Sequence, residues 1–247
     1  MTDSTRPDPF GPPISAGGRV ARLAGAADMP GVLDLRAAAF RQGRDDRDDF
    51  DSDSLHLWVG RPAGPVEATL RVRRHRDATG LLQGYAASLY DLGAMARLGG
   101  ETLELGRLCT QGGDGDLLRL LWAGVARLAL VTGAARLIGC TSFHTTDAGS
   151  LGPAWALLAA RHQGPADRRP AAKAPETLSF DTVQASADPE AAALLPGLLR
   201  AYLAMGGWVS DHVVIDRDLG TCHVFTCVEI DRMPEARRRA LQRLASG

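Results

Sequence analysis

The sequence predicts a mixed α/β fold in which helices cover both faces of one mixed β-sheet, as a three-layer sandwich. Three observations lead to this prediction. An antiparallel run of strand-like segments comes early, a strand–loop–helix unit follows in the middle, and further strand-like segments come after it. A regular doubly wound sheet would need strict alternation of strands and helices, which the first half of the chain lacks.

Strands are predicted where apolar and β-branched residues alternate or run together, and helices where apolar residues recur every three or four positions. The predicted strands are residues 20–23, 55–59, 67–75, 102–105, 136–142 and 222–230, while 208–215 is either a strand or a loop. The predicted helices are residues 30–40, 117–131, 153–161, 194–203 and 234–244, with loop and short helix over 84–97.

Composition indicates how the chain is organised. Residues 1–18 are rich in Pro, Gly and Ser, which predicts a disordered tail. Residues 19–247 are expected to form a single domain, because a chain of this length can bury one large core. An exposed excursion is expected at about 164–190, and the last predicted helix is basic.

Overall charge and residue usage exclude several classes of protein. The hydrophobic fraction of 45% and the charged fraction of 23% are those of a soluble globular protein, expected in the cytoplasm. The net charge of −1 gives no reason to expect nucleic acid as a partner. No apolar run is long enough to span a membrane, and no secretory leader pattern is present. No metal site is expected, because four cysteines without CxxC spacing indicate reduced core thiols: Cys109, Cys140, Cys222 and Cys227.

The segment Glu104-Leu-Gly-Arg107 is the strongest candidate for a functional site. A strand ends there, a glycine-rich loop follows at 111–115, and a helix begins near Leu117. Carboxyl ends of strands are places where ligands reach polar side chains. The alternative is an internal ion pair that fixes the end of the strand.

Three further groups precede this segment along the chain, each with an alternative structural interpretation. Aspartates can be loop surface, arginines can be solvated, and a histidine on an apolar strand can be a core residue. The groups are Arg36 with Phe40, Asp48-Asp-Phe-Asp51 with His56, and Thr69-Leu-Arg71.

Taken together, the order R-xxx-F, D-xx-D, T-x-R and E-xx-R resembles the acyl-homoserine-lactone synthases and their relatives in the GCN5-related N-acyltransferase (GNAT) superfamily. Further motifs make the chain more similar to the L-ornithine N-alpha-acyltransferases, the hemolysin-like branch, from about Arg19 to about Arg232. These motifs are Asp49-Phe-Asp51, Gly84-Tyr85, Leu103-Glu-Leu-Gly-Arg107, Leu121-Trp122, Gly139-Cys-Thr-Ser-Phe143, Thr146-Asp147, Leu195-Pro196, Ala201-Tyr-Leu203 and Ile215-Asp216.

The resemblance implies transfer of a 3-hydroxyacyl group from acyl carrier protein to the alpha-amino group of L-ornithine, giving lyso-ornithine lipid. No cofactor is implied beyond the carrier-protein thioester. Glu104 would accept a proton from the ammonium, and Arg107 would hold Glu104 or bind the substrate carboxylate. Asp49 and Asp51 would offer negative charge to the delta-ammonium. The implied substrate-binding residues are Arg36, Phe40, Asp49, Asp51, Arg71 and Ser142, and the implied donor-binding residues are Gln111, Gly112, Gly113, Gly115 and Trp122.

The donor loop departs from the family pattern. It reads Gln111-Gly-Gly-Asp-Gly-Asp, with Asp114 and Asp116 and no arginine before Arg119. Two carboxylates weaken attraction for a highly charged nucleotide such as coenzyme A, so the loop favours a carrier-protein donor. Backbone N–H groups at the helix start can still bind a phosphate.

Two basic segments are candidate docking surfaces. Residues 71–76 form a basic edge suited to an acidic carrier protein, and the basic C-terminal helix suits a peripheral contact with anionic lipid. The alternative for both is a solvated charged face. The functional alternatives are an autoinducer synthase, an N-acyltransferase for another amino acid, and a non-catalytic module that binds an acyl chain. The oligomeric state is left open.

Overall fold

The computed structural model describes residues 9–184 and 191–246. Within these ranges no helix is both long and apolar enough to cross a membrane. The chain divides into two compact units. Unit 1 contains residues 1–73, 105–134 and 235–247, and unit 2 contains residues 74–104 and 135–234.

Unit 1 is built on a sheet with the strand order β1-β2-β3-β4-β6. Its strands are β1 (Ile14–Ala16), β2 (Arg19–Leu23), β3 (Ser54–Gly60), β4 (Val66–His75) and β6 (Thr102–Thr110). Its helices are α1 (Met29–Phe40), α5 (Gly115–Thr132) and α8 (Glu235–Ser246). Strands β4 and β6 each run from one unit into the other.

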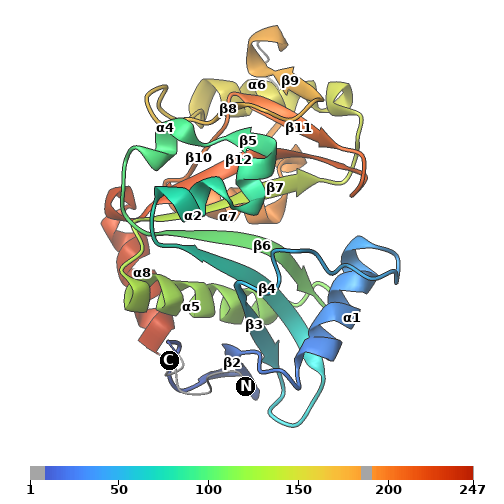
Figure 1. Ribbon diagram of the computed structural model, residues 1–247, viewed down its shortest axis with the longest axis vertical. Helices are drawn as coiled ribbons and strands as arrows, with labels where there is room; N and C mark the ends of the chain where they lie inside the picture. Colours follow the sequence, from blue (N-terminus) through green and yellow to red (C-terminus); the bar gives the residue numbers. More distant parts are fainter. Residues whose placement is uncertain (1–8, 185–190, 247) are drawn as a thin grey trace. The chain divides into compact units, whose positions relative to one another are not determined.

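Helices cover both faces of this sheet. Leu57 of β3 is buried against α5, where a Cβ added to Gly124 would come within 2.9 Å of its side chain. The next residue, Trp58, packs with Val32 of α1. Because successive side chains of a strand point to opposite faces, α1 and α5 lie on opposite sides of the sheet (Figure 1).

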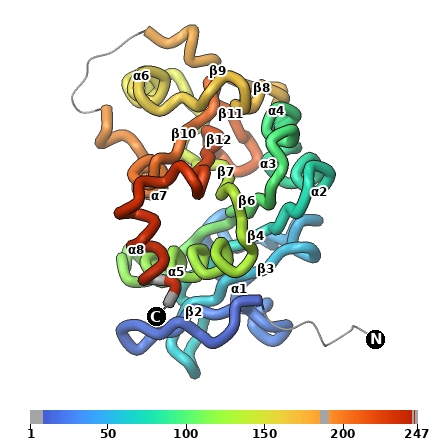
Figure 2. The backbone as a smooth tube through the Cα atoms, turned by 90° about the vertical axis from the view of Figure 1, so that its left-hand side faces the viewer, coloured from blue at the N-terminus to red at the C-terminus, as the bar shows by residue number. Residues whose placement is uncertain are grey.

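Helix α8 lies against α5 (Figure 2), and Arg127 of α5 ties down both ends of the described chain. Its Nε and Nη2 donate to the carbonyl oxygen of Ala245, and its Nη1 donates to that of Pro12. Its guanidinium carbon lies 5.3 Å from the ring centre of Phe10. The tail predicted over residues 1–18 is therefore wrong for residues 10–16, where Phe10 and Ile14 are buried and β1 pairs with β2.

Unit 2 is built on a sheet with the order β7-β12-β11-β9, and a short strand, β10, also pairs with β12. Its strands are β7 (Arg136–Phe143), β9 (Thr177–Ser179), β10 (Trp208–Val209), β11 (His212–Asp216) and β12 (Thr221–Glu229), with a separate pair β5 (Tyr90–Asp91) and β8 (Ala171–Ala172). Its α-helices are α2 (Ala78–Leu82), α3 (Tyr85–Leu89), α4 (Gly93–Ala96), α6 (Gly152–Arg161) and α7 (Gly197–Ala204). Its 3-10 helices are η1 (Ala148–Leu151), η2 (Phe180–Thr182), η3 (Ala191–Leu194) and η4 (Ile230–Arg232).

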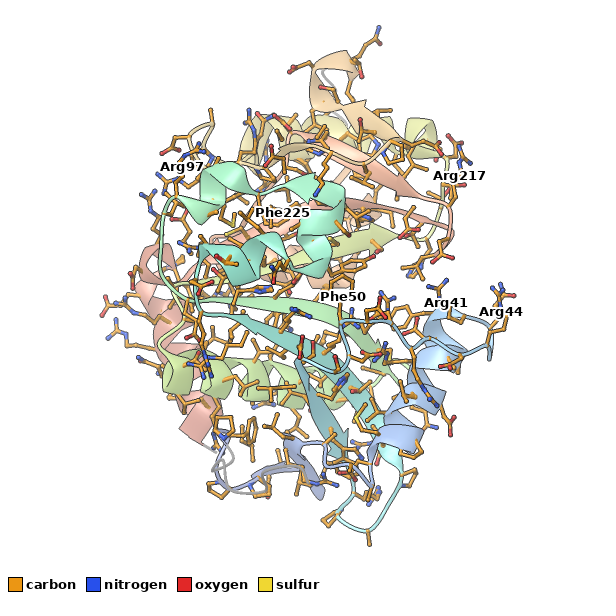
Figure 3. All side chains as sticks on the ribbon, in the orientation of Figure 1. Arg41, Arg44, Phe50, Arg97, Arg217 and Phe225 are labelled. Atoms are coloured by element: carbon orange, nitrogen blue, oxygen red, sulfur yellow. The ribbon has the colours of Figure 1, made fainter. Side chains whose placement is uncertain are left out.

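This sheet is also covered on both faces. Val224 of β12 joins a core with Trp155 of α6, whereas the neighbouring Phe225 joins a second core with Ala86 of α3. Phe225 lies behind the short helices in Figure 3. The α/β class with helices on both sheet faces is thereby confirmed in each unit.

The excursion predicted at about 164–190 is more ordered than expected where the structure describes it. Strand β9 pairs with β11, and Phe180 is buried in the core that contains Trp155. Residues 185–190 lie outside the described ranges. An apolar anchor at Phe180 therefore holds this segment on the sheet.

Candidate active site

A buried group of arginines and aspartates in unit 1 contains four of the residues that the sequence singled out: Arg36, Asp51, Arg71 and Arg107. Arg36 of α1 is at its centre, and its side chain is 0% exposed. Its Nε donates to Asp46 Oδ2 at 2.9 Å, its Nη1 to Asp51 Oδ1 at 2.7 Å and its Nη2 to Asp51 Oδ2 at 3.2 Å. Its Nη2 also donates to the carbonyl oxygen of Asp46 at 2.8 Å. Arg36 therefore fixes the loop after α1 and has no surface to offer a substrate.

Asp51 is saturated by its partners. Oδ1 accepts from Arg36 and, at 2.8 Å, from Arg71 Nη1, while Oδ2 accepts from Arg36 and from the backbone N–H of Asp48 at 3.1 Å. Burial alone would raise the pKa of Asp51, but the hydrogen bonds from Arg36 and Arg71 outweigh it and lower the pKa to about 2. With about four lone-pair positions on a carboxylate, Asp51 has none left for a substrate ammonium, which corrects its expected role.

Asp48 and Asp46, rather than Asp49, are the aspartates that join Asp51 in the arginine–aspartate group. Asp49 is exposed, and its backbone carbonyl accepts from Ser52. Asp48 bonds to Arg71 and lies 3.4 Å from Arg107 Nη2, whereas Asp46 bonds to Arg36. The spacing D-xx-D, which begins at Asp48, was the sequence signal that pointed to this group. No sequence pattern pointed to Asp46.

Arg107 joins the same group from β6. Its Nε donates to Asp46 Oδ2 at 2.9 Å, and its guanidinium carbon lies 5.6 Å from the ring centre of Phe40. Its φ is 52°, a left-handed conformation that costs a non-glycine residue about 1–2 kcal/mol. Strained residues of this kind cluster at functional sites.

His56 of β3 borders the arginine–aspartate group. Its Nε2 lies 3.9 Å from Asp51 Oδ1, too far for a hydrogen bond, and burial lowers its pKa. The ring is therefore uncharged near neutral pH. The core interpretation of this histidine fits its 5% exposure.

Glu104 has its partners in unit 2. Its Oε2 lies 2.8 Å from His75 Nε2 and accepts from the backbone N–H of Tyr85 at 3.2 Å, while its Oε1 accepts from that of Ala86 at 2.5 Å. A carboxylate at this position supplies acceptors for the first N–H groups of α3. Three of about four lone-pair positions are thus used, and one remains on Oε1.

Gly84 is needed where the backbone passes this carboxylate. A Cβ at Gly84 would come within 2.5 Å of Glu104 Oε2 and 2.9 Å of His75 Nε2. The contact between His75 and Glu104 was not apparent from the sequence, because the two residues are 29 positions apart. That Arg107 holds Glu104 stays a prediction, and the bonds described for this carboxylate come from His75, Tyr85 and Ala86.

The predicted donor loop forms the start of α5. Gln111, Gly112, Gly113 and Gly115 are exposed, and Gly112 takes a φ of 77°. Asp114 caps the helix, accepting from Asp116 N at 2.9 Å, and lies 2.9 Å from Arg19 Nη1. Trp122 is half-buried further along α5. The backbone at the three glycines is accessible to a ligand. The carboxylate of Asp114 already accepts from the N–H of Asp116, which is one of the first N–H groups of α5.

Ser142 lies on β7 opposite His223 of β12 in the sheet register, and it is half-buried. His223 is 1% exposed, and its Nδ1 lies 3.0 Å from the hydroxyl of Tyr90. Tyr90 directly follows α3, whose other end is held by Glu104. Glu104 and His223 are therefore linked through one short helix within unit 2.

In the basic edge predicted at residues 71–76, Arg76 is exposed, whereas the other basic members have partners. Arg74 pairs with Glu101, His75 with Glu104, and Arg73 stacks on Phe50 with its guanidinium carbon 5.4 Å from the ring centre. Figure 3 shows Phe50 on the loop after α1, beyond Arg41 and Arg44. In α8, by contrast, Arg243 is exposed and borders a cavity of about 690 Å³ that Arg119 and Ile14 also line.

Comparison with known proteins agrees with this architecture. Residues 32–123 match the acetyltransferase (GNAT) domain family. FeeM, an N-acyl amino acid synthase from uncultured soil microbes, has a similar fold, with a TM-score of 0.53 and 10% identity over 87% of this chain and 93% of that one. The chain thus has the GNAT fold.

Two curated relatives define its family more closely. An L-ornithine N(alpha)-acyltransferase of Rhodobacter capsulatus is 31% identical over 216 residues, which cover 83% of each chain. Another, from Brucella abortus, is 29% identical over 200 residues, 76% of this chain and 71% of that one. The chain belongs to the L-ornithine N(alpha)-acyltransferase family, which confirms the resemblance seen in its motifs.

Proposed function

We propose that the protein transfers an acyl group from acyl carrier protein to the alpha-amino group of L-ornithine, giving lyso-ornithine lipid. The observation that carries the acceptor is the 31% identity to an L-ornithine N(alpha)-acyltransferase over 83% of both chains. The donor assignment is supported by the loop at 111–116, whose Asp114 and Asp116 disfavour a polyanionic nucleotide.

Glu104 is the proposed proton acceptor. The amine nitrogen attacks the thioester carbon, an N–C bond forms and the C–S bond breaks. The amine proton passes, directly or through a water molecule, to the remaining lone-pair position on Glu104 Oε1, and the departing thiolate then takes it up. Hydrogen bonds from Tyr85 N, Ala86 N and His75 hold this carboxylate in place.

The arginine–aspartate group is proposed to hold the loop after α1 within unit 1 rather than to bind ornithine through Arg36 or Asp51. Arg36 and Asp46 are closed off from solvent, so they fix the loop that carries Asp48 and Phe50. The strained backbone at Arg107 supports a positional role for its guanidinium, because only a specific placement justifies that strain.

The test is an acylation assay with purified protein. Acyl carrier protein and coenzyme A thioesters of the same 3-hydroxyacyl chain would each be offered with L-ornithine, with a panel of other amines including S-adenosylmethionine, and without any amine, and the products weighed by mass spectrometry. N-acyl-ornithine from the carrier-protein donor is expected. An acyl-homoserine lactone would support the autoinducer alternative, equal use of coenzyme A would contradict the donor, and no product with any amine would contradict the proposal.

Glu104→Gln tests the proton acceptor. Because Gln keeps the size of Glu but cannot take up the proton, kcat is expected to fall at least about a hundredfold. A folded Glu104→Gln variant with parental kcat would exclude this role. Arg97→Gln, in an exposed stretch of the same unit, is the matched control and should leave kcat unchanged.

A further inference from the structure

The cavity of about 690 Å³ in unit 1 takes no part in the arginine–aspartate group or in the bonds to Glu104. It is lined by residues of β1, of the first half of α5 and of α8. Binding sites for small ligands have volumes of about 300–1,000 Å³, so a small molecule fits into this one. Arg127 binds the carbonyl oxygens of Pro12 and Ala245, and it thereby holds the chain near β1 and at the end of α8, on either side of the cavity.

The buried part of the cavity lining is apolar. Ile14 of β1 is 3% exposed, and Leu120 and Ala123 of α5 are 3% and 2% exposed. Ala240 of α8 adds a fourth apolar side chain. Because the removal of apolar surface from water is favourable, this lining favours a ligand with an apolar part over an inorganic ion.

The exposed part of the lining is charged. Arg119 and Arg243 are exposed, and neither makes an ion pair within the residues that the structure describes. The third charged residue of the lining is Asp116, so the lining carries a net charge of +1. This charge suits a singly charged anion such as a phosphodiester better than a nucleotide with several phosphates. A guanidinium is well suited to such a ligand, because its planar fork binds two phosphate oxygens at once.

Positive charge continues along α8 beyond the cavity. Residues 235–246 contain four arginines and one glutamate, a net charge of +3. Arg239 lies one turn before Arg243 on the same side of the helix, and its ion pair with Glu235 at 3.2 Å is exposed and therefore weak. Arg237 is exposed as well. A single small anion would need only the arginines of the cavity, whereas a surface composed of many anions also meets those outside it.

We propose that this cavity binds the phosphodiester headgroup of an anionic phospholipid and so places the protein on the surface of an anionic membrane. Arg119 and Arg243 bind the phosphate oxygens, and the apolar lining receives the glycerol backbone and the start of an acyl chain. The other arginines of α8 face neighbouring headgroups. The proposal concerns binding alone, so it does not rest on the proposed acyl transfer.

The first experiment is flotation of the purified full-length protein with vesicles of phosphatidylcholine, or of an equimolar mixture of phosphatidylcholine and phosphatidylglycerol. The parent should bind the mixture only. Arg119→Gln combined with Arg243→Gln should bind it about thirtyfold more weakly, because each arginine near an anionic surface contributes about a factor of five. Arg44→Gln combined with Arg61→Gln is the matched control, since it removes two exposed arginines of unit 1 that do not line the cavity, and it should bind like the parent.

A second measurement separates the cavity from a general attraction to charge. Dihexanoyl-phosphatidylglycerol, a soluble lipid with the same headgroup, would be titrated into the protein below its micelle concentration, and its binding followed by calorimetry. Ala240→Phe fills the cavity but keeps both arginines, so it should weaken this binding at least about tenfold. Ala236→Phe, at an exposed position one turn earlier in α8, should not. Glycerol 3-phosphate and hexanoate, which carry the headgroup phosphate or the apolar chain alone, should bind more weakly than the lipid.

Four results would overturn the proposal. The first is equal binding to both kinds of vesicle, and the second is a double arginine variant that binds within about threefold of the parent. The third is parental binding of the soluble lipid by Ala240→Phe, which would mean adsorption outside the cavity only. The fourth is binding of glycerol 3-phosphate or hexanoate as tight as that of the lipid, which would assign the cavity to a soluble anion.

A carrier protein is the competing partner for the same arginines, because it too is acidic. Acyl carrier protein would therefore be titrated into the parent and the double arginine variant. Loss of carrier-protein binding with vesicle binding retained would assign the two arginines to that partner and refute the lipid site. Urea unfolding shows whether each variant is folded. The arginine variants change exposed side chains only, so they keep the test decisive if Ala240→Phe does not fold.

Discussion

Replacing Gly84 by alanine tests whether the tightly held Glu104 carboxylate matters to both folding and catalysis. The backbone at Gly84 has φ −77° and ψ 168°, which alanine adopts without strain. The whole effect therefore comes from the new methyl group, which would meet Glu104 Oε2 at 2.5 Å and His75 Nε2 at 2.9 Å.

The loss of unfolding free energy follows from the hydrogen bonds that the Glu104 carboxylate would lose. Relief of a contact of 2.5 Å requires a shift of about an ångström, which breaks at least one of the bonds from Tyr85 N and His75. A hydrogen bond to a charged group contributes about 1.5–3 kcal/mol, and overpacking costs about 1–3 kcal/mol. Because one displacement causes both losses, we expect a destabilisation of about 2–4 kcal/mol.

The assay is urea unfolding combined with acyltransferase kinetics. Gly80→Ala is the matched control, since a Cβ there meets nothing closer than 3.6 Å and alanine favours the helix. In a Glu104→Ala background the cost of Gly84→Ala should shrink, because its main obstacle is gone. Gly84→Ala protein that unfolds within about 0.5 kcal/mol of the parent and keeps its kcat/KM would refute the reasoning.

Three further predictions concern unit 1. Arg36→Met should cost about 3–5 kcal/mol in urea unfolding, because it removes the hydrogen bonds that Arg36 donates to Asp46 and Asp51 inside the buried group, whereas the exposed control Arg47→Met should change stability by less than about 0.5 kcal/mol. The pKa of Asp51 falls from 3.8 to about 2 on folding, so its charged form stabilises the fold by at most about 2 kcal/mol. This contribution is present above about pH 4 and is lost as the pH falls toward 2. Asp51→Asn should therefore flatten the profile of unfolding free energy against pH in this range, and an unchanged slope would contradict the assignment. Asp114→Ala should cost about 0.5–2 kcal/mol by removing the α5 cap, with Asp114→Asn retaining most of it; equal losses in both would point to the Arg19 ion pair instead.

Regular elements were predictable from the sequence because their patterns are local. The alternating run that forms β4, the helical spacing of α5 and the β-branched run of β12 each specify their structure within about ten residues. Strand β1 was missed because the residues that hold it in place are distant in the sequence. Ile14 lies within a Pro/Gly-rich stretch and is held by pairing with Ala21 and by the Arg127 contacts of its neighbours.

In the candidate site too, some residues were predictable from the sequence and others were not. The order R-xxx-F, D-xx-D, T-x-R and E-xx-R, through its resemblance to a known family, singled out Arg36, Arg71, Glu104 and Arg107. Their partners were not predictable. Asp46 was one acid among many in a charged loop, and two of the bonds to Glu104 come from backbone N–H groups, which every residue but proline carries.

Arg127 has a consequence for how unit 1 opens. Its guanidinium is shared between the carbonyl oxygens of Pro12 and Ala245, so release of the Pro12 segment leaves one of the three nitrogens without its acceptor, and release of the Ala245 segment leaves two. Amide protons of β1, α5 and α8 should therefore exchange with solvent as one cooperative group rather than fraying separately. Protection at one end of the described chain would then report the integrity of the other.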